Sequence, residues 1–144
     1  MVIYADSSFL VSCYVVDANT LQAKAFLSQH DSPLPFTALH DLEVRNALRL
    51  GVFRGILTEE QAKAAAANLD ADLGAGRLMR RTVQWPIAFQ LASRLSERHA
   101  AVTGTRSFDI LHVAVAKTLR LKELASFDSR QRALGVAAGL TEAP

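Results

Sequence analysis

Residues 2–6 read Val2-Ile3-Tyr4-Ala5-Asp6, a short apolar run that ends on a carboxylate. The run is too short for a helix and begins with β-branched residues, so it predicts a buried strand. Further short strands are expected at residues 34–37, 78–83 and 123–126, between stretches that favour helices. This alternation predicts an α/β fold, in which a parallel sheet is covered by helices on both faces.

The helices are predicted from caps, breakers and apolar stretches. Thr58 and Gln61 have the spacing of a capping box, Pro86 suits a first helical turn, and Gly104 suits a helix end. The expected helices cover residues 7–13, 19–29, 39–53, 58–74, 86–102, 107–121 and 131–138. The stretch at 107–121 is apolar on nearly every face, which predicts a buried helix.

The composition bounds the class of protein. The chain has 144 residues, half of them apolar, which fits one globular domain over residues 1–144. We expect no membrane segment and no secretory signal, because the apolar runs are short and no basic region precedes them. Cys13 is the only cysteine, which excludes an internal disulfide and a cysteine-based zinc site. A reducing cytoplasm is the expected compartment.

Four acidic residues lie beside apolar segments, where a surface carboxylate is not expected. They are Asp6, Glu43, Asp109 and Asp128. An unpaired charge is costly to bury, so a shared partner is needed, and a divalent cation is the simplest one. Carboxylate oxygens suit Mg²⁺, for which Mn²⁺ can substitute. Asp6 and Asp128 also follow predicted strands, at the sheet edge where ligands bind in open α/β folds.

Each of these acids also has a structural explanation. Asp6 and Asp128 could cap the helices that follow them, and Asp109 could stabilise the first turn of its helix through the dipole. His112, one turn after Asp109, is expected to be a hydrogen-bonded core residue. Ser8 could contact substrate or water, or could cap a helix.

Helix geometry bears on Glu43. With 100° per residue, a broad apolar arc is formed by Leu39, Leu42, Ala47, Leu50 and Phe53. Glu43 and Asn46 fall near the middle of this arc, so Glu43 is expected to face the core, and Asn46 could orient its carboxylate or a bound water. The alternatives are a buried arginine partner for Glu43, or a helix rotated from this estimate.

The charge balance favours a polyanionic partner. The formal net charge is +2, but without the four acids 16 basic residues remain against 10 acidic ones, a net charge of +6. Candidate contacts to a nucleic-acid backbone are Arg77, Arg80, Arg81 and Arg106. The alternative is an ordinary solvated surface. No nucleophile elbow, P-loop, dinucleotide fingerprint or H-E-x-x-H motif is present.

Four segments together resemble PIN-domain ribonucleases, most closely the VapC-type toxins of prokaryotic toxin–antitoxin pairs. The segments are Ile3-Tyr4-Ala5-Asp6-Ser7-Ser8, Leu42-Glu43-Val44-Arg45-Asn46-Ala47-Leu48, Ser107-Phe108-Asp109-Ile110-Leu111-His112-Val113-Ala114-Val115-Ala116 and Leu124-Ala125-Ser126-Phe127-Asp128-Ser129-Arg130-Gln131-Arg132. Taken in this order, the four segments extend from residue 2 to about residue 132, which is nearly the whole chain.

The resemblance implies a three-layer α/β/α sandwich with a central parallel sheet. It also implies a Mg²⁺- or Mn²⁺-dependent endoribonuclease that hydrolyses RNA phosphodiesters with a metal-activated water. The family's metal site carries over to Asp6, Glu43, Asp109 and Asp128. Its accessory polar positions carry over to Ser8 and Asn46. Many relatives have another acid where this chain has Arg130, which leaves one or two metals open.

The same resemblance implies a cognate VapB-type antitoxin as partner, and a homodimer. Residues 8–29 and 39–53 would form the groove that receives the antitoxin, and apolar side chains are expected to be exposed there. Two other functions stay open. One is a phosphoryl-transfer enzyme with Asp6 as nucleophile, although Ser8 stands where a second aspartate is wanted. The other is an RNA-binding protein that has kept the fold outside a toxin–antitoxin pair.

Overall fold

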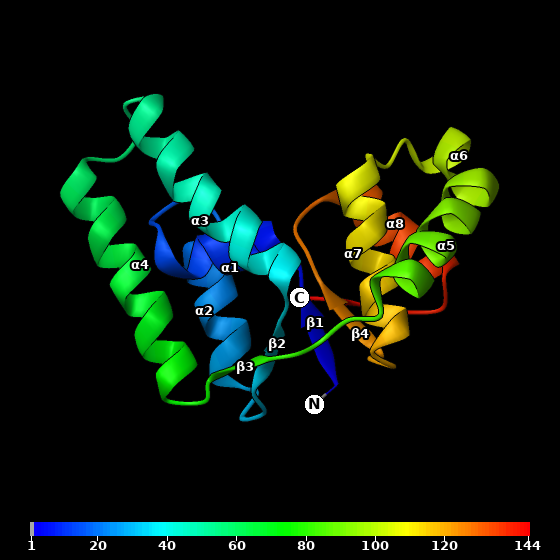
Figure 1. Cartoon of the computed structure of the whole chain (residues 1–144), viewed down its shortest axis with the longest axis horizontal. Coiled ribbons are helices and arrows are strands. Elements are labelled where there is room, and N and C mark those ends of the chain that lie inside the picture. Colours follow the sequence, from blue (N-terminus) through cyan, green and yellow to red (C-terminus); the bar gives the residue numbers. More distant parts are fainter. Residues whose placement is uncertain (1) are drawn as a thin grey trace. The chain divides into compact units, whose positions relative to one another are not determined.

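The computed structural model describes residues 2–144, in which short parallel strands alternate with helices (Figure 1). The chain forms two compact units. The first unit contains residues 2–6 together with Thr82–Pro144, and the second unit contains Ser7–Arg81. Within the described chain, no helix is both long and apolar enough to cross a lipid bilayer.

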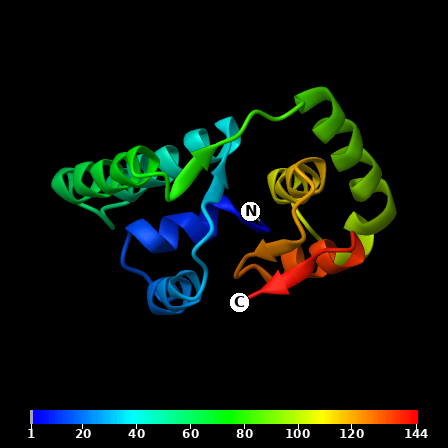
Figure 2. The ribbon, with the colours of Figure 1, turned by 90° about the horizontal axis from the view of Figure 1, so that it is seen from below.

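The first unit contains a three-stranded parallel sheet in the order β1-β4-β5. Its strands are β1 (Ile3–Ala5), β4 (Glu123–Ala125) and β5 (Thr141–Ala143), with Tyr4 paired beside Leu124. Figure 2 shows β4 and β5 side by side, in orange and red. All of β1 is buried, which explains why this stretch is apolar throughout instead of alternating with polar residues.

Helices of the first unit pack around a buried central helix, α7. The helical segments are α5 (Trp85–Leu95), the π-helical η1 (Ser96–Ala100), α6 (Ala101–Thr103), α7 (Ser107–Thr118) and α8 (Ser129–Ala137). Every residue from 110 to 116 is buried, and α7 packs against both α5 and α8. The buried helix predicted from the sequence is therefore confirmed.

The second unit contains a two-stranded parallel sheet, β2 (Leu34–Phe36) with β3 (Leu78–Arg80). Its helices are α1 (Ser7–Tyr14), α2 (Thr20–Ser28), α3 (Ala38–Phe53) and α4 (Glu59–Gly74). The short α1 packs against the other three helices of this unit, and α3 packs against α4.

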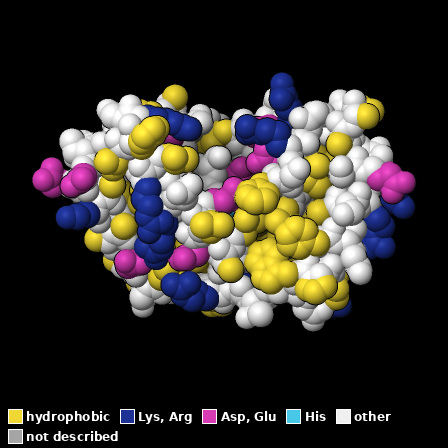
Figure 3. Space-filling view, turned by 45° about the horizontal axis from the view of Figure 1, so that its top comes forward, with side chains coloured by type: hydrophobic (Ala, Val, Ile, Leu, Met, Phe, Trp, Pro, Cys, Tyr) yellow, Lys and Arg dark blue, Asp and Glu magenta, His cyan; other side chains and the backbone are white. Residues whose placement is uncertain are grey.

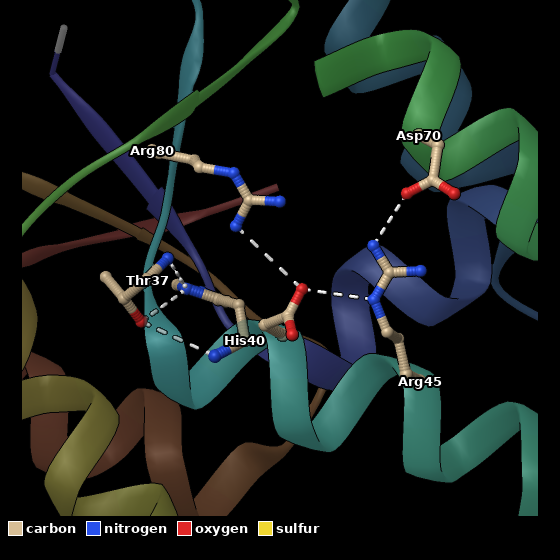
Figure 4. A network of polar contacts seen from close by, with 6 residues as sticks. Thr37, His40, Arg45, Asp70 and Arg80 are labelled. Carbon is tan, nitrogen blue, oxygen red and sulfur yellow. Dashed lines mark hydrogen bonds and ion pairs between the residues drawn. The ribbon is translucent and has the colours of Figure 1, made fainter. Parts of the chain in front are cut away.

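The start of α3 is fixed by a reciprocal cap between Thr37 and His40 (Figure 4). The Thr37 hydroxyl accepts from the His40 N–H at 3.4 Å, and the His40 Nδ1 accepts from the Thr37 N–H at 3.0 Å. One turn later, the Arg45 guanidinium donates to Asp70 of α4 at 2.7 Å. Both residues of the cap are buried, so the position at which this helix begins is strongly determined.

Three features of the fold differ from the sequence predictions. The strand β5 was not predicted, because two of its three residues are exposed and no apolar run marks it. The strand predicted at 78–83 ends at Arg80. The expected central sheet is present as two parallel sheets among the described residues, one in each unit. The α/β class itself is confirmed, and so are the Thr58 capping box and the helix end at Gly104.

Removing the hydroxyl of Thr37 is expected to destabilise the second unit. Thr37→Ala should lower the free energy of unfolding by about 1 kcal/mol, because the first turn of α3 loses a buried cap. Thr37→Ser keeps the hydroxyl and should stay close to the parent. Urea unfolding followed by circular dichroism measures both variants, and equal losses for alanine and serine would contradict the assigned cap.

Candidate functional site

Two of the predicted acids, Asp109 and Asp128, interact at the starts of neighbouring helices in the first unit. Burial raises the pKa of the half-buried Asp109 carboxyl, and the negative charge of Asp128 raises this pKa further. The guanidinium of Arg106, whose Nε lies 3.4 Å from the Asp109 Oδ2, opposes both effects. Two neighbouring carboxylates repel each other, and a cation bound between them relieves this repulsion.

Asp128 also has the structural role that the sequence left open. Its Oδ1 accepts from the N–H of Arg130 at 2.8 Å and from the N–H of Gln131 at 3.0 Å, so Asp128 caps α8. The cap and the charge beside Asp109 are compatible, because capping fixes one oxygen and with it the direction of the carboxylate.

Gln131 is a residue of the site that sequence reasoning missed. Its side chain is fully buried, and its Nε2 donates to the backbone carbonyl of Asp109 at 3.1 Å. Its Oε1 has no hydrogen-bond partner among the residues that the structure describes. A glutamine three residues after a cap predicts a side chain folded back on that cap. Here it reaches α7 instead, and this long-range contact leaves no local signal.

Asp6 lies directly after β1 and is buried. Its backbone N–H donates to the carbonyl of Ala125 at 3.1 Å, which extends the pairing of β1 with β4. Because β1 and β4 are parallel, Asp6 and Asp128 both follow the carboxyl ends of neighbouring strands, as predicted. Across residues 2–144, however, no group of three or more Asp, Glu, His or Cys side chains is arranged so that it could hold a metal ion.

Glu43 belongs to the second unit, where it bonds to a serine that the sequence analysis did not select. The Ser7 hydroxyl donates to the Glu43 Oε1 at 2.9 Å. Ser7 is buried and follows Asp6 directly in the chain, whereas the predicted Ser8 is exposed. The two serines are adjacent and chemically identical, so only the start of α1 at Ser7 decides which of them turns inward.

The predicted rotation of α3 was wrong. The buried side chains of this helix are Leu39, His40, Val44 and Leu48, whereas Leu42, Leu50 and Phe53 are exposed. Glu43 therefore lies at the border of the buried stripe, half-buried, and Asn46 is exposed. The estimate failed because the expected apolar arc included three exposed residues, Leu42, Leu50 and Phe53, and left out the buried Val44 and Leu48.

His112 is a core residue, as predicted. The hydroxyl of Tyr4 lies 2.6 Å from the His112 Nδ1, and both side chains are buried. This contact links β1 to α7 one turn after Asp109.

Several of the basic residues proposed for nucleic-acid contacts are in ion pairs. Arg77 donates to Asp72 at 2.6 Å, and Arg80 lies 4.0 Å from Asp41. Arg106 is paired with Asp109 while its side chain stays 80% exposed. Of these three, Arg106 is the one that lies beside an acid of the predicted metal set.

The first unit therefore has a pair of carboxylates at the edge of its sheet. Other proteins of known structure share the fold of this chain. No family model matches the chain, and no curated protein sequence matches it. VapC20 of Mycobacterium tuberculosis, a sarcin–ricin loop cleaving toxin, has a TM-score of 0.71 at 19% identity, and the match covers 98% of each chain. FitAcB of Neisseria gonorrhoeae has a TM-score of 0.67 at 19% identity, covering 99% of this chain and 96% of that one.

A third structure is VapBC2 of Rickettsia felis, bound to a DNA fragment from its promoter. It has a TM-score of 0.67 at 12% identity, covering 99% of this chain and 98% of that chain. The chain thus has the PIN-type α/β fold of VapC toxins, which confirms the fold expected from the resemblance. At these identities the likeness establishes the fold, so activity must be argued from the site.

The two roles of Asp128 can be separated by substitution. Asp128→Ala should lower the free energy of unfolding by about 1 kcal/mol, because the first turn of α8 loses its cap. Asp128→Asn should stay within about 0.5 kcal/mol of the parent, since asparagine caps helices as well as aspartate does. Thermal or urea unfolding without added metal measures both variants. Equal stability of the alanine variant and the parent would contradict the cap.

Proposed function

We propose that this chain is a metal-dependent endoribonuclease that acts as the toxin of a toxin–antitoxin pair. The fold supports the assignment, since solved structures that share it include a toxin that cleaves the sarcin–ricin loop. The acidic residues support it more specifically. The observation that carries the proposal is the interaction of Asp109 with Asp128 at the sheet edge, where burial and mutual repulsion raise the pKa of Asp109.

The chemistry of these donors fits Mg²⁺ or Mn²⁺. Both carboxylates offer hard oxygens, and Mg²⁺ is commonly held by one or two carboxylates while it keeps several waters and binds substrate phosphate. A pair of acids is therefore sufficient to begin such a site. We assign Asp6 and Glu43 to the same ligand set, as the resemblance implies. When bound, the cation supplies charge neutralisation at the phosphate and lowers the pKa of a coordinated water.

The residues around the acids have distinct tasks in this proposal. The Asp128 cap and the Gln131 side chain hold the two carboxylate-bearing helix starts in register. Ser7 orients Glu43 through its hydrogen bond. Arg106 balances the charge of Asp109 in the resting protein, and its exposed guanidinium is free to turn to an RNA phosphate when substrate arrives.

Substitution of Asp109 tests the activity. Asp109→Asn should lower Mn²⁺-dependent RNA cleavage by more than about 100-fold, because losing even an outer partner of a metal ligand typically costs 10- to 100-fold. Asp31→Asn, at an exposed turn between α2 and β2, removes the same charge elsewhere and should leave the rate unchanged. Cleavage of a labelled RNA pool on denaturing gels measures both. The products should carry a 5′-phosphate and a 3′-hydroxyl.

Cleavage by the Asp109→Asn variant at the parent rate would overturn the assignment. Cleavage that persists in excess chelator would overturn the metal requirement alone. Binding of RNA without any cleavage would instead support an RNA-binding protein with this fold.

Metal binding can be measured without activity. At a concentration 100 times the dissociation constant, Mn²⁺ should add about 2.7 kcal/mol to the free energy of unfolding of the parent protein. Asp128→Asn keeps its cap but removes one charge, so it should show a clearly smaller gain. Thermal unfolding with and without Mn²⁺ gives this comparison, and an equal gain in both proteins would exclude Asp128 as a ligand.

We further propose a VapB-type antitoxin as the partner. The expected apolar exposure is confirmed in the second unit, where the exposed side chains include Val16, Leu21, Leu42, Leu50 and Phe53. A helix with an apolar face would cover such side chains. Expression of the chain alone should arrest growth, coexpression of its cognate antitoxin should relieve this arrest, and Phe53→Asp should weaken the relief. Relief that is identical for Phe53→Asp and the parent would exclude this face.

A further inference from the structure

A cavity lies in the first unit, and its lining includes Phe108, the chain neighbour of Asp109, but none of the four predicted acids. It has a volume of about 390 Å³ and is bounded by α5, η1 and α7. Its lining residues are Phe89, Ala92, Ser93, Ser96, Glu97, Ser107, Phe108, Ile110 and Leu111. This volume is within the range of small-molecule sites, which combine apolar walls with a few polar groups.

Two phenylalanine rings form the apolar part of its rim. Phe89 is 55% exposed and Phe108 is 52% exposed, although both are large apolar side chains. Figure 3 shows hydrophobic side chains gathered on one face of the unit that contains α5 and α7. Partly exposed aromatic rings beside a cavity are the usual platform on which unstacked nucleobases bind.

Part of the polar lining of the cavity comes from an unusual turn of helix. The segment η1 (Ser96–Ala100) is π-helical, a rare form that occurs frequently at functional sites. Two of its residues, Ser96 and Glu97, line the cavity. The wide turn therefore adds a hydroxyl and a carboxylate to a wall that also includes the hydroxyls of Ser93 and Ser107. A carboxylate accepts hydrogen bonds but donates none, so it selects a ligand edge that presents N–H groups.

The cavity is connected to the acids through the first turn of α7. Phe108 lines the cavity on the side of α5, and the next residue, Asp109, interacts with Asp128 on the side of α8. Consecutive Cα atoms are about 3.8 Å apart. One nucleotide could therefore place its phosphate near Asp109 and its base near Phe108.

We propose that this cavity binds an unstacked guanine base of the RNA strand, next to the phosphate held at Asp109. The base stacks on Phe108 and Phe89, and its N1–H and N2–H₂ groups donate to the Glu97 carboxylate. Uracil presents one N–H on the corresponding edge, so it forms one such bond instead of two. The inference rests on the proposed ribonuclease function, since the occupant is part of the substrate of that activity.

The single tryptophan of the chain provides a readout that needs no cleavage. Trp85 lies on α5, and its ring centroid is 6.5 Å from that of Phe89. The parent protein is titrated in chelator with the tetranucleotides UUGU and UUUU, and Trp85 emission is recorded. UUGU should change the emission with an affinity about 10-fold higher than that of UUUU, as expected for one additional good polar pair.

Two variants assign the effect to the cavity. Phe108→Ala should weaken UUGU binding by about 10- to 100-fold, because it removes one stacking surface. Glu97→Gln should abolish the preference for UUGU over UUUU. The matched controls are Ile56→Ala and Glu60→Gln, which change exposed residues of the second unit and should bind as the parent does. Circular dichroism checks that all four variants are folded.

Equal affinities of the parent for UUGU and UUUU would overturn the inference. So would unchanged binding by Phe108→Ala and Glu97→Gln. If Phe108→Ala instead converts a dimer into a monomer while oligonucleotide binding is unchanged, the rings form a contact between two copies of the chain. A selective Trp85 response without any RNA cleavage would contradict the proposed nuclease activity and leave the base site standing. Cleavage without a selective Trp85 response would support the nuclease activity and contradict the base site.

Discussion

The candidate site depends on one buried side chain that fastens two helix starts to each other. Gln131 donates through its backbone to the Asp128 carboxylate and through its amide to the backbone of Asp109. The spacing between the two acids is therefore set by a neutral residue that carries no charge of its own. Its Oε1 has no hydrogen-bond partner within residues 2–144, which is costly in a buried position, so shorter apolar side chains would relieve that cost and lose the link.

The same pair of acids suits a bound cation but lowers the stability of the fold when no cation is present. A half-buried carboxyl with a raised pKa, next to a second carboxylate, is a poor structural element in the absence of a cation. Helix α7 tolerates it because residues 110–116 are entirely buried and hold the helix in place. The contact of Tyr4 with His112 adds a second attachment, from β1, one turn along the same helix. The close packing of α7 in the core thus compensates for the unfavourable charges of Asp109 and Asp128 at its start.

The sequence predicted what depends on neighbours along the chain, and it failed where contacts between distant segments decide. Three features were predicted from local sequence patterns and are present: the strand before Asp6, the buried helix α7 and the Thr58 cap. The strand β5 was missed because its residues are mostly exposed. The face of α3 was misjudged because apolar residues lie on both sides of this helix, and tertiary packing buries Val44 and Leu48 while Leu42 and Phe53 stay exposed. Gln131 was missed because its partner is 22 residues away. The four acids were found by their apolar surroundings, although their grouping into one ligand set stays a prediction.

The π-helical segment Ser96–Ala100 gives the proposed base site a place where recognition can change while the four acids stay unchanged. A π turn holds one residue more than an α turn, so deleting a single residue there would restore a regular helix. Side chains before and after the deletion would then shift by about 100° relative to each other. The acids are outside this segment and would keep their positions. Insertions and deletions at this point are thus an economical evolutionary route by which related chains could diverge in what they recognise.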